Sequence, residues 1–381
     1  MFCKRIILMI FLLSAALTAS AQGISFVCEA SQVSMIQKQF EGYLHSLGIA
    51  SRLYQVHLGD RTINYRIKSD TNDTSTLYIR WNPEFAIENE VVRLPSTRGF
   101  QKVRTVSKKE IVLALMHPGR KTEFSGKACS LEAFQDHVHV RQMIVAWAEN
   151  LEWKFPDGQS ASWNRAYWID GTLRPGKPLL DAMTDFFINQ EQCSVGCYTA
   201  TKIVIIQGVL DYYARIKKDM VMVEQIKKTL MRDGEVLVDI EPDAMWNFLR
   251  DIKQSSQSAV GKLLTVQFDV APYNFVPGDW VYFVNPDSET ADLSGYEGSN
   301  SIYMGRARFD DFYNDNNHHY LYTEKLKEVY NWRYGVFSRS RDYERLRPMQ
   351  DDMYHALSQT PKAGGLVFQN RAVPRFFGFT D

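Results

Sequence analysis

A long apolar segment near the middle of the chain, at residues 199–217, constrains the fold more than any other feature. It contains the run Ile203-Val-Ile-Ile, followed by Val209 and Leu210, and shows little sign of a polar face. A helix that is apolar all round is buried between neighbouring elements. Ala200 and Gly208 have small or no side chains, so another element can approach closely there. The segment therefore predicts a helix that packs tightly against its neighbours.

Helical and strand patterns are segregated along the rest of the chain. Apolar residues recur at helical spacing in four further stretches: 31–48, 108–116, 131–151 and 324–330. Alternation typical of strands occurs in two groups, at 52–58, 62–67 and 77–81 and, after the central segment, at 265–270, 280–284 and 301–304. This order predicts an α+β fold. We expect a small N-terminal α+β unit over residues 24–125 and the main domain over residues 126–381.

The N-terminus has the pattern of an export signal. Lys4 and Arg5 precede an apolar run from Ile6 to Leu17, and Ala19-Ser20-Ala21 supplies the small residues that signal peptidase requires. We predict a signal peptide at residues 1–21, cleaved after Ala21, and a secreted or periplasmic mature protein. The apolar run is too short to span a bilayer comfortably, and no later stretch is long enough, so no membrane span is expected.

Four cysteines remain after that cleavage: Cys28, Cys129, Cys193 and Cys197. An oxidising compartment permits two disulfides. One arrangement joins Cys28 to Cys129 and so ties the N-terminal segment to the main body. Cys193 and Cys197 would pair only if their backbones lie within disulfide range.

Cys197 stands just before the apolar segment, and its position predicts chemistry. A thiol at a helix N-terminus lies near unpaired N–H groups and the positive end of the dipole, which favour the thiolate. The same N–H groups can donate hydrogen bonds to the oxyanion of a tetrahedral intermediate. We expect Gly196 to permit a strained approach to the helix. The alternatives are an inert buried cysteine or a Cys193–Cys197 disulfide.

A cysteine nucleophile needs a base, and His318 or His319 in the strand-rich half is the candidate. These histidines follow an acidic segment with Asp310, Asp311 and Asp315, which is typical of a solvated loop. The alternative is that the two histidines are not a base and lie exposed in a polar surface turn.

Composition argues against several other functions. The 381 residues include 44 Lys and Arg and 44 Asp and Glu, with no basic run, so no nucleic-acid partner is expected. The sequence has no Cys-x-x-Cys or His-Glu-x-x-His metal motif, and no Gly-x-x-x-x-Gly-Lys-Ser/Thr or Gly-x-Gly-x-x-Gly phosphate-binding motif. We therefore expect no metal and no cofactor.

Several short motifs occur in an order that resembles the small bacterial protein-glutamine γ-glutamyltransferases of the spore-coat cross-linking type. The motifs are Arg141-Gln-Met-Ile-Val-Ala-Trp-Ala, Asn164-Arg-Ala-Tyr-Trp168, Cys197-Tyr-Thr-Ala200, Gly278-Asp-Trp-Val-Tyr-Phe-Val-Asn-Pro286, Gly298-Ser-Asn300 and Leu357-Ser-Gln359. The motif that begins at Gly278 is the most specific of them. Together they extend over about residues 130–360.

The resemblance implies a papain-like core, related to transglutaminase and NlpC/P60 folds, in which a nucleophile helix packs on an antiparallel sheet. It implies that Cys197 forms a thioester with a glutamine side chain and transfers it to a lysine amine, so that the partners are protein substrates. Trp168, Trp280, Tyr282 and Asn300 are the residues we expect to bind substrate or exclude water.

The chain departs from the family pattern at three places. The family has glutamate where this chain has Gly196 and again where it has Ser299. Glu297, two residues earlier, is the candidate substitute that would orient the imidazole. An insertion over 314–317 would bring His318 or His319 to the family's histidine position. Loss of the glutamates leaves one alternative open, a secreted cysteine amidase or peptidase with water as acceptor. A further alternative is a non-catalytic binding protein with Cys193 and Cys197 oxidised.

Overall fold

The computed structural model describes residues 23–68, 76–118, 121–156, 159–231, 238, 258–260, 263–267, 274–285, 287–293, 295–314, 319–334, 347–359, 363–367 and 371–374. The predicted signal peptide and His318 lie outside these ranges. No helix within them combines the length and apolar content needed to cross a bilayer.

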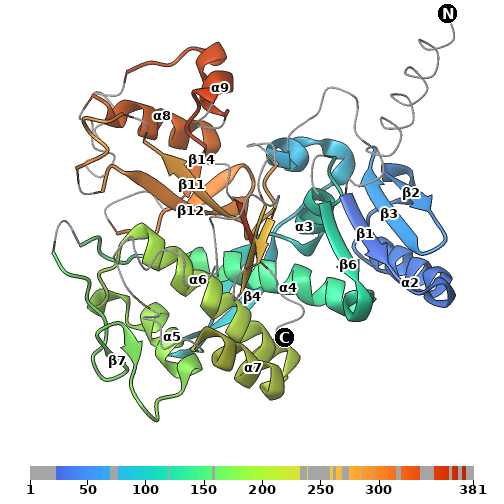
Figure 1. Ribbon diagram of the computed structural model, residues 1–381, viewed down its shortest axis with the longest axis horizontal. Coiled ribbons are helices and arrows are strands. Elements are labelled where there is room, and N and C mark those ends of the chain that lie inside the picture. Colours follow the sequence, from blue (N-terminus) through green and yellow to red (C-terminus); the bar gives the residue numbers. More distant parts are fainter. Residues whose placement is uncertain are drawn as a thin grey trace, which may run out of the picture.

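The N-terminal part contains a four-stranded sheet with helix α2 (Val33–Ser46) beside it (Figure 1). The strand order is β2 (Tyr54–Leu58), β3 (Thr62–Ile67), β1 (Gly23–Val27) and β6 (Lys121–Ser125), with β1 and β6 parallel. The strands predicted at 52–58 and 62–67 are confirmed as β2 and β3, which pair in antiparallel register.

The strand predicted at 77–81 is wrong. Residues Thr76–Trp81 form a 3-10 helix that contacts α3 (Lys108–Leu115). Leu77 and Ile79 are both buried, as alternation requires. They are buried by a tight helical turn, which a two-residue burial period alone does not distinguish from a strand.

Four helices form the centre of the molecule: α4 (Leu131–Ala148), α5 (Leu179–Ile188), α6 (Cys197–Asp211) and α7 (Met220–Leu230). Helix α6 is the predicted apolar helix. Every residue from Tyr198 to Asp211 is buried, and the chain continues as a π-helix over Tyr212–Lys217. A Cβ atom added to Gly208 would lie 2.7 Å from the backbone of Ile144 on α4. The predicted close approach at this glycine is therefore confirmed.

A seven-stranded sheet packs on α4 and α6 of this helical layer (Figure 1). The strand order is β14 (His319–Leu321), β13 (Arg308–Asp310), β12 (Gly298–Gly305), β11 (Trp280–Val284), β15 (Arg371–Pro374), β10 (Leu264–Gln267) and β9 (Ser258–Val260). All of these strand pairs are antiparallel. Trp280, Ile302 and Met304 belong to the core cluster shared with α4 and α6.

The opposite face of this sheet packs on α8 (Tyr322–Trp332), which in turn contacts α9 (Asp351–Leu357). Val281, Phe283 and Phe309 form this second cluster with Leu326 and Val329 of the helix. The expected α+β class, with the cysteine-bearing helix on an antiparallel sheet, is confirmed.

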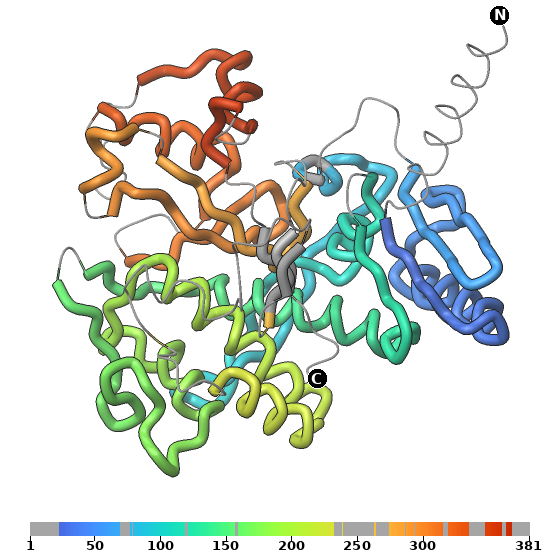
Figure 2. Tube along the Cα trace, viewed as in Figure 1, coloured from blue at the N-terminus to red at the C-terminus, as the bar shows by residue number. Residues whose placement is uncertain are grey.

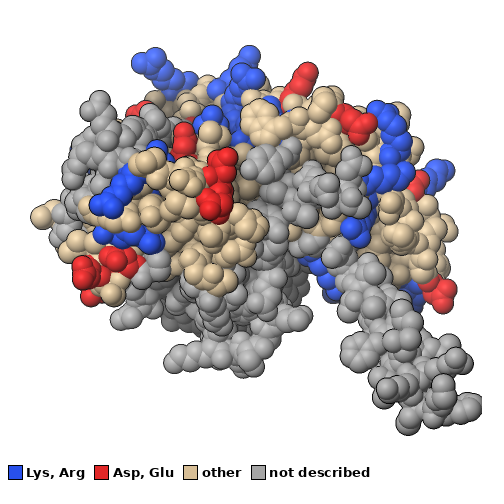
Figure 3. Space-filling model, turned by 90° about the horizontal axis from the view of Figure 1, so that it is seen from above, with Lys and Arg blue, Asp and Glu red and all other residues tan. Residues whose placement is uncertain are grey.

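The N-terminal part and the helical layer share one apolar core. The hairpin of β4 (Glu90–Ser96) and β5 (Gly99–Thr105) packs on α4, and β4 also contacts α5, far along the chain (Figure 2). A disulfide joins Cys28, after β1, to Cys129, before α4. A small hairpin of β7 (Trp168–Ile169) and β8 (Thr172–Leu173) precedes α5. On the face seen in Figure 3, described basic and acidic side chains are interspersed.

Candidate active site

Cys197 is the first residue of α6, where the helix meets the seven-stranded sheet. Gly196, which precedes it, has φ −71° and ψ 162°. This is an extended conformation that any residue adopts, so the expectation of a strained approach at Gly196 is wrong. Cys193 and Cys197 are both free; the Cys193 side chain is buried and its sulfur lies 3.8 Å from the Asn189 carbonyl oxygen.

Asn300 on β12 points two donors at the Cys197 sulfur. Its backbone N–H donates to Sγ at 3.5 Å and its side-chain Nδ2 at 3.4 Å. The Trp280 Nε1–H donates to the Asn300 Oδ1 at 2.9 Å, which fixes the orientation of the amide. The Trp280 ring also packs on Tyr198 of α6, with the centroids 5.5 Å apart. The sheet thus positions a paired donor site beside the thiol.

Tyr282 packs on Gly298, because a Cβ atom there would lie 2.3 Å from the tyrosine ring. The two residues are diagonal neighbours across the β11–β12 pair, where Tyr282 is opposite Asn300 and Val284 is opposite Gly298. Burial raises the pKa of Tyr282, and nearby Cys197 and Glu297 raise it further. The Tyr282 side chain is therefore an uncharged phenol.

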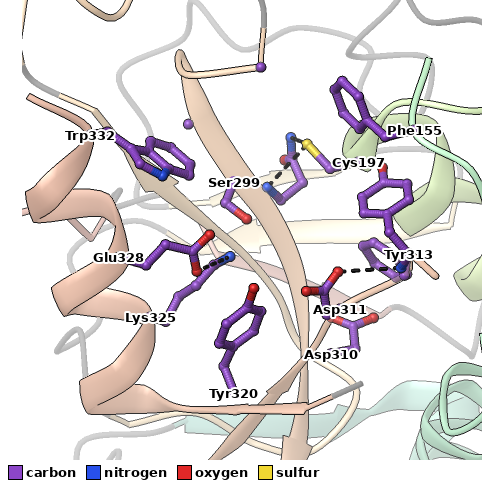
Figure 4. A pocket seen from close by; sticks show the side chains of 14 residues that line it. Phe155, Cys197, Ser299, Asp310, Asp311, Tyr313, Tyr320, Lys325, Glu328 and Trp332 are labelled. Atoms are coloured by element: carbon purple, nitrogen blue, oxygen red, sulfur yellow. Dashed lines mark hydrogen bonds and ion pairs between the residues drawn. The ribbon is translucent and has the colours of Figure 1, made fainter. Parts of the chain in front are cut away.

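A pocket of about 50 Å³ opens at the thiol, between the start of α6, the sheet and α8 (Figure 4). The side chains that line the pocket include seven polar or charged ones that could take part in a reaction: Cys197, Ser299, Asn300, Asp310, Asp311, Lys325 and Glu328. Lys325 Nζ lies 3.2 Å from the Glu328 Oε2, and both side chains are buried. The pocket is large enough for a few waters or a small polar group.

Burial raises the pKa of the Cys197 thiol, and Glu297 adds to this shift. The Asn300 hydrogen bonds and the positive charge of Lys325 oppose it without cancelling it. The sequence-based expectation that the helix start would favour the thiolate is therefore wrong, because desolvation outweighs these stabilising contacts. The resting group is a thiol, and it needs a base.

Comparison with known proteins identifies the family. Residues 85–315 match the profile of the protein-glutamine gamma-glutamyltransferase family. The chain belongs to this family. The transglutaminase match contains Cys197, Trp280 and Asn300 and begins before β4, so it includes residues that we assigned to the N-terminal unit. It ends before His318.

One similar solved structure is the transglutaminase from Geobacillus stearothermophilus without its C-terminal extension. It is 16% identical, has a TM-score of 0.38, and the likeness covers 65% of this chain and 94% of that one. No curated protein sequence matches the chain.

The structure does not bring every predicted transglutaminase residue to the pocket. His319 lies on β14 with its Nε2 3.4 Å from the Glu149 Oε2, and it does not line the pocket. Trp168 is buried against Phe186, at 5.7 Å between ring centroids, and is likewise absent from the lining.

Glu297 is exposed, and its carboxylate accepts the Gly295 N–H at 2.9 Å. It is near enough to influence the pKa of Cys197 but does not line the pocket. Within the described ranges, no group of His, Cys, Asp and Glu side chains is arranged to hold a metal ion.

Four charged residues of the pocket were not predicted as site residues: Asp310, Asp311, Lys325 and Glu328. Asp310 belongs to the acidic segment that we interpreted as a solvated loop, yet it is only 2% exposed. That interpretation is wrong for Asp310, because the segment begins inside the sheet. Lys325 and Glu328 share one face of a short amphipathic helix, which is the sequence signal that was available.

Proposed function

We propose that the protein is a cysteine acyltransferase that joins glutamine side chains to lysine amines. The observation that carries this proposal is the pair of Asn300 donors directed at the sulfur of Cys197 in a chain of the transglutaminase family. Donors placed at a nucleophile's sulfur also lie close to the oxygen that becomes negative when the sulfur attacks a carbonyl.

In the proposed reaction, Cys197 attacks the carboxamide carbon of a glutamine side chain. The carbonyl oxygen becomes an oxyanion that the Asn300 donors stabilise, and ammonia leaves as the thioester forms. A lysine amine then attacks the thioester, the C–S bond breaks, and an isopeptide bond joins the two proteins. Trp280 and Tyr282 do not line the pocket themselves; Trp280 holds the Asn300 amide and Tyr282 packs on Gly298, so both support the strands that bear the donor pair.

The test is incorporation of a fluorescent primary amine into a glutamine-containing protein. We expect Cys197→Ala to abolish incorporation and to leave the fold intact, since Cys197 is at the edge of a helix whose other residues form the core. Cys193→Ala is the matched control, because Cys193 is a free thiol four residues away that is buried outside the pocket. Equal incorporation by the wild type and Cys197→Ala would contradict the proposal.

Hydrolysis is a second candidate function, favoured by one observation. Ser299 lines the pocket where the family has glutamate, so the chain lacks a carboxylate at that position. Ammonia release would be measured with and without added amine. Release that rises with amine concentration supports transfer, and release that ignores the amine supports an amidase or peptidase.

We also propose that the protein is exported. The charged start, apolar run and small residues at the N-terminus support this, as does the Cys28–Cys129 disulfide, since disulfides persist in oxidising compartments. N-terminal sequencing of the mature protein would test it, with Gln22 expected as the first residue.

A further inference from the structure

Asp310 is a buried carboxyl group at the point where two strands separate. Strands β12 and β13 pair at Tyr303–Phe309 and Gly305–Arg308. Beyond that point the Asp310 Oδ1 accepts the Ile302 N–H at 2.5 Å, in the place where a strand carbonyl would otherwise do so. The side chain is thereby fixed by the sheet and does not depend on a flexible loop.

The second oxygen of Asp310 is buried and has no hydrogen-bond partner in the described part of the chain. A buried acceptor without a partner costs about 1–3 kcal/mol, so such groups are uncommon unless they have a role. Asp310 lines the same small pocket as Cys197, together with Asn300 (Figure 4). The pocket therefore contains a nucleophile, a donor pair and a carboxyl oxygen with unused hydrogen-bonding capacity.

Charged and titratable groups surround this carboxyl on several sides. Asp311 follows it in the chain, Lys325 and Glu328 project from α8, and Tyr320 lies on β14. His319 is its cross-strand partner in the sheet. Burial raises the pKa of Asp310 well above its usual range and Asp311 adds to this, while the Ile302 hydrogen bond and Lys325 oppose it. A carboxyl group with a raised pKa is a stronger base, once ionised, than an exposed aspartate.

We propose that Asp310 is the proton-transfer residue for Cys197, a role that rests on the acyl transfer proposed above. The Asp310 carboxylate accepts the thiol proton as the C–S bond forms, and the resulting acid donates it to the leaving nitrogen as the C–N bond breaks and ammonia departs. In the second half, the carboxylate accepts a proton from the attacking amine. It returns this proton to the sulfur as the C–S bond breaks.

The main test is Asp310→Asn, compared with Asp292→Asn, an exposed aspartate that does not line the pocket, as the control. Asparagine keeps the size and an oxygen acceptor for Ile302 but cannot accept the proton. We expect the rate of amine incorporation to fall by about 10²- to 10⁴-fold in Asp310→Asn. The wild-type rate should rise with pH as Asp310 ionises, and this rise should be absent from the variant. An unchanged rate and pH profile would overturn the proposal.

Thermal stability separates a catalytic loss from misfolding. A carboxyl whose pKa is raised in the folded state contributes its stability fully below the unfolded pKa of about 4 and loses it as pH rises. Asp310→Asn should therefore melt no lower than wild type at neutral pH, and its relative stability should increase as pH rises from 4. If the variant nevertheless unfolds, Asp310→Glu and Asp310→Gln provide a size-matched pair, and only the glutamate should retain activity.

Alkylation of Cys197 by iodoacetamide distinguishes failure of this proposal from failure of the proposed function. A wild type that neither incorporates amine nor releases ammonia contradicts acyl transfer. Alkylation still reports on Asp310 in that case, because it requires only that the thiol lose its proton. Slower alkylation in Asp310→Asn than in Asp292→Asn supports the role, and equal rates in both variants and wild type contradict it.

Discussion

Asn300 directs both of its N–H donors at one sulfur atom, and its side chain is held by Trp280. We predict that Asn300→Ala lowers kcat by about 10²- to 10³-fold with little change in KM, because the lost side-chain donor acts on the developing oxyanion. Steady-state amine incorporation would measure both constants. Asn314→Ala, at an exposed position, is the control. A rise in KM with unchanged kcat would assign Asn300 to substrate binding instead.

The residues that could be predicted from sequence differ from those that could not in a physical way. Cys197 was indicated by its position before the apolar segment, and Trp280 and Asn300 were indicated by motifs that resemble those of the family. Asp310 was missed because an acidic residue is normally expected at the surface, whereas this one is buried. Its burial depends on where β12 and β13 separate. Trp168 was assigned to the site from its motif, but the structure uses it as core.

At the scale of elements, the turn between β12 and β13 is held by the N-terminal half of the chain. Arg306 and Ala307 both have positive φ, at 58° and 56°. The Arg306 N–H donates to the Glu110 Oε1 at 2.7 Å, and its guanidinium lies 2.7 Å from the Glu149 Oε1. Glu110 also pairs with Arg80 at 2.9 Å. Helices α3 and α4 thus fix the turn whose strands carry Asn300 and Asp310.

We predict that Glu110→Ala destabilises the fold by about 3–5 kcal/mol, because it leaves the half-buried Arg80 and the Arg306 N–H without their buried acceptor. The same change should also lower amine incorporation at temperatures well below that of unfolding. Asn300 lies on β12, whose turn Glu110 no longer holds in the variant. Urea denaturation would measure the free energy of unfolding. Glu84→Ala, an exposed glutamate on the neighbouring segment, should change it by less than about 0.5 kcal/mol. Equal effects of the two variants would refute the turn's dependence on Glu110.

Elements were predicted well where their apolar period was long. The apolar run at 199–217 and the pattern at 131–151 became α6 and α4 because both are long and buried, and propensity and packing agree there. The five-residue pattern at 77–81 was too short to distinguish a strand from a 3-10 helix. Its structure is decided by the contact with α3, which no local pattern contains.

At the scale of the whole molecule, one disulfide links two distant parts of the chain. Cys28 and Cys129 are 101 residues apart, and their bond joins the N-terminal sheet to the start of α4, which packs on α6. Chain-entropy arguments assign about 4.7 kcal/mol to a loop of about 100 residues, and native disulfides typically contribute about 2–5 kcal/mol. The cross-link therefore stabilises the whole core and not the N-terminal sheet alone.

We predict that the double variant Cys28→Ser/Cys129→Ser lowers the free energy of unfolding by about 2–5 kcal/mol, measured by urea denaturation. Cys193→Ser is the control, because it removes a free buried thiol and no cross-link. Iodoacetamide labelling of Cys197 should stay at the wild-type rate at low temperature, since neither bridging cysteine lines its pocket. A double variant as stable as wild type would show that the shared apolar core suffices without the covalent link. Loss of Cys197 labelling at low temperature would instead show that the bridge positions α6.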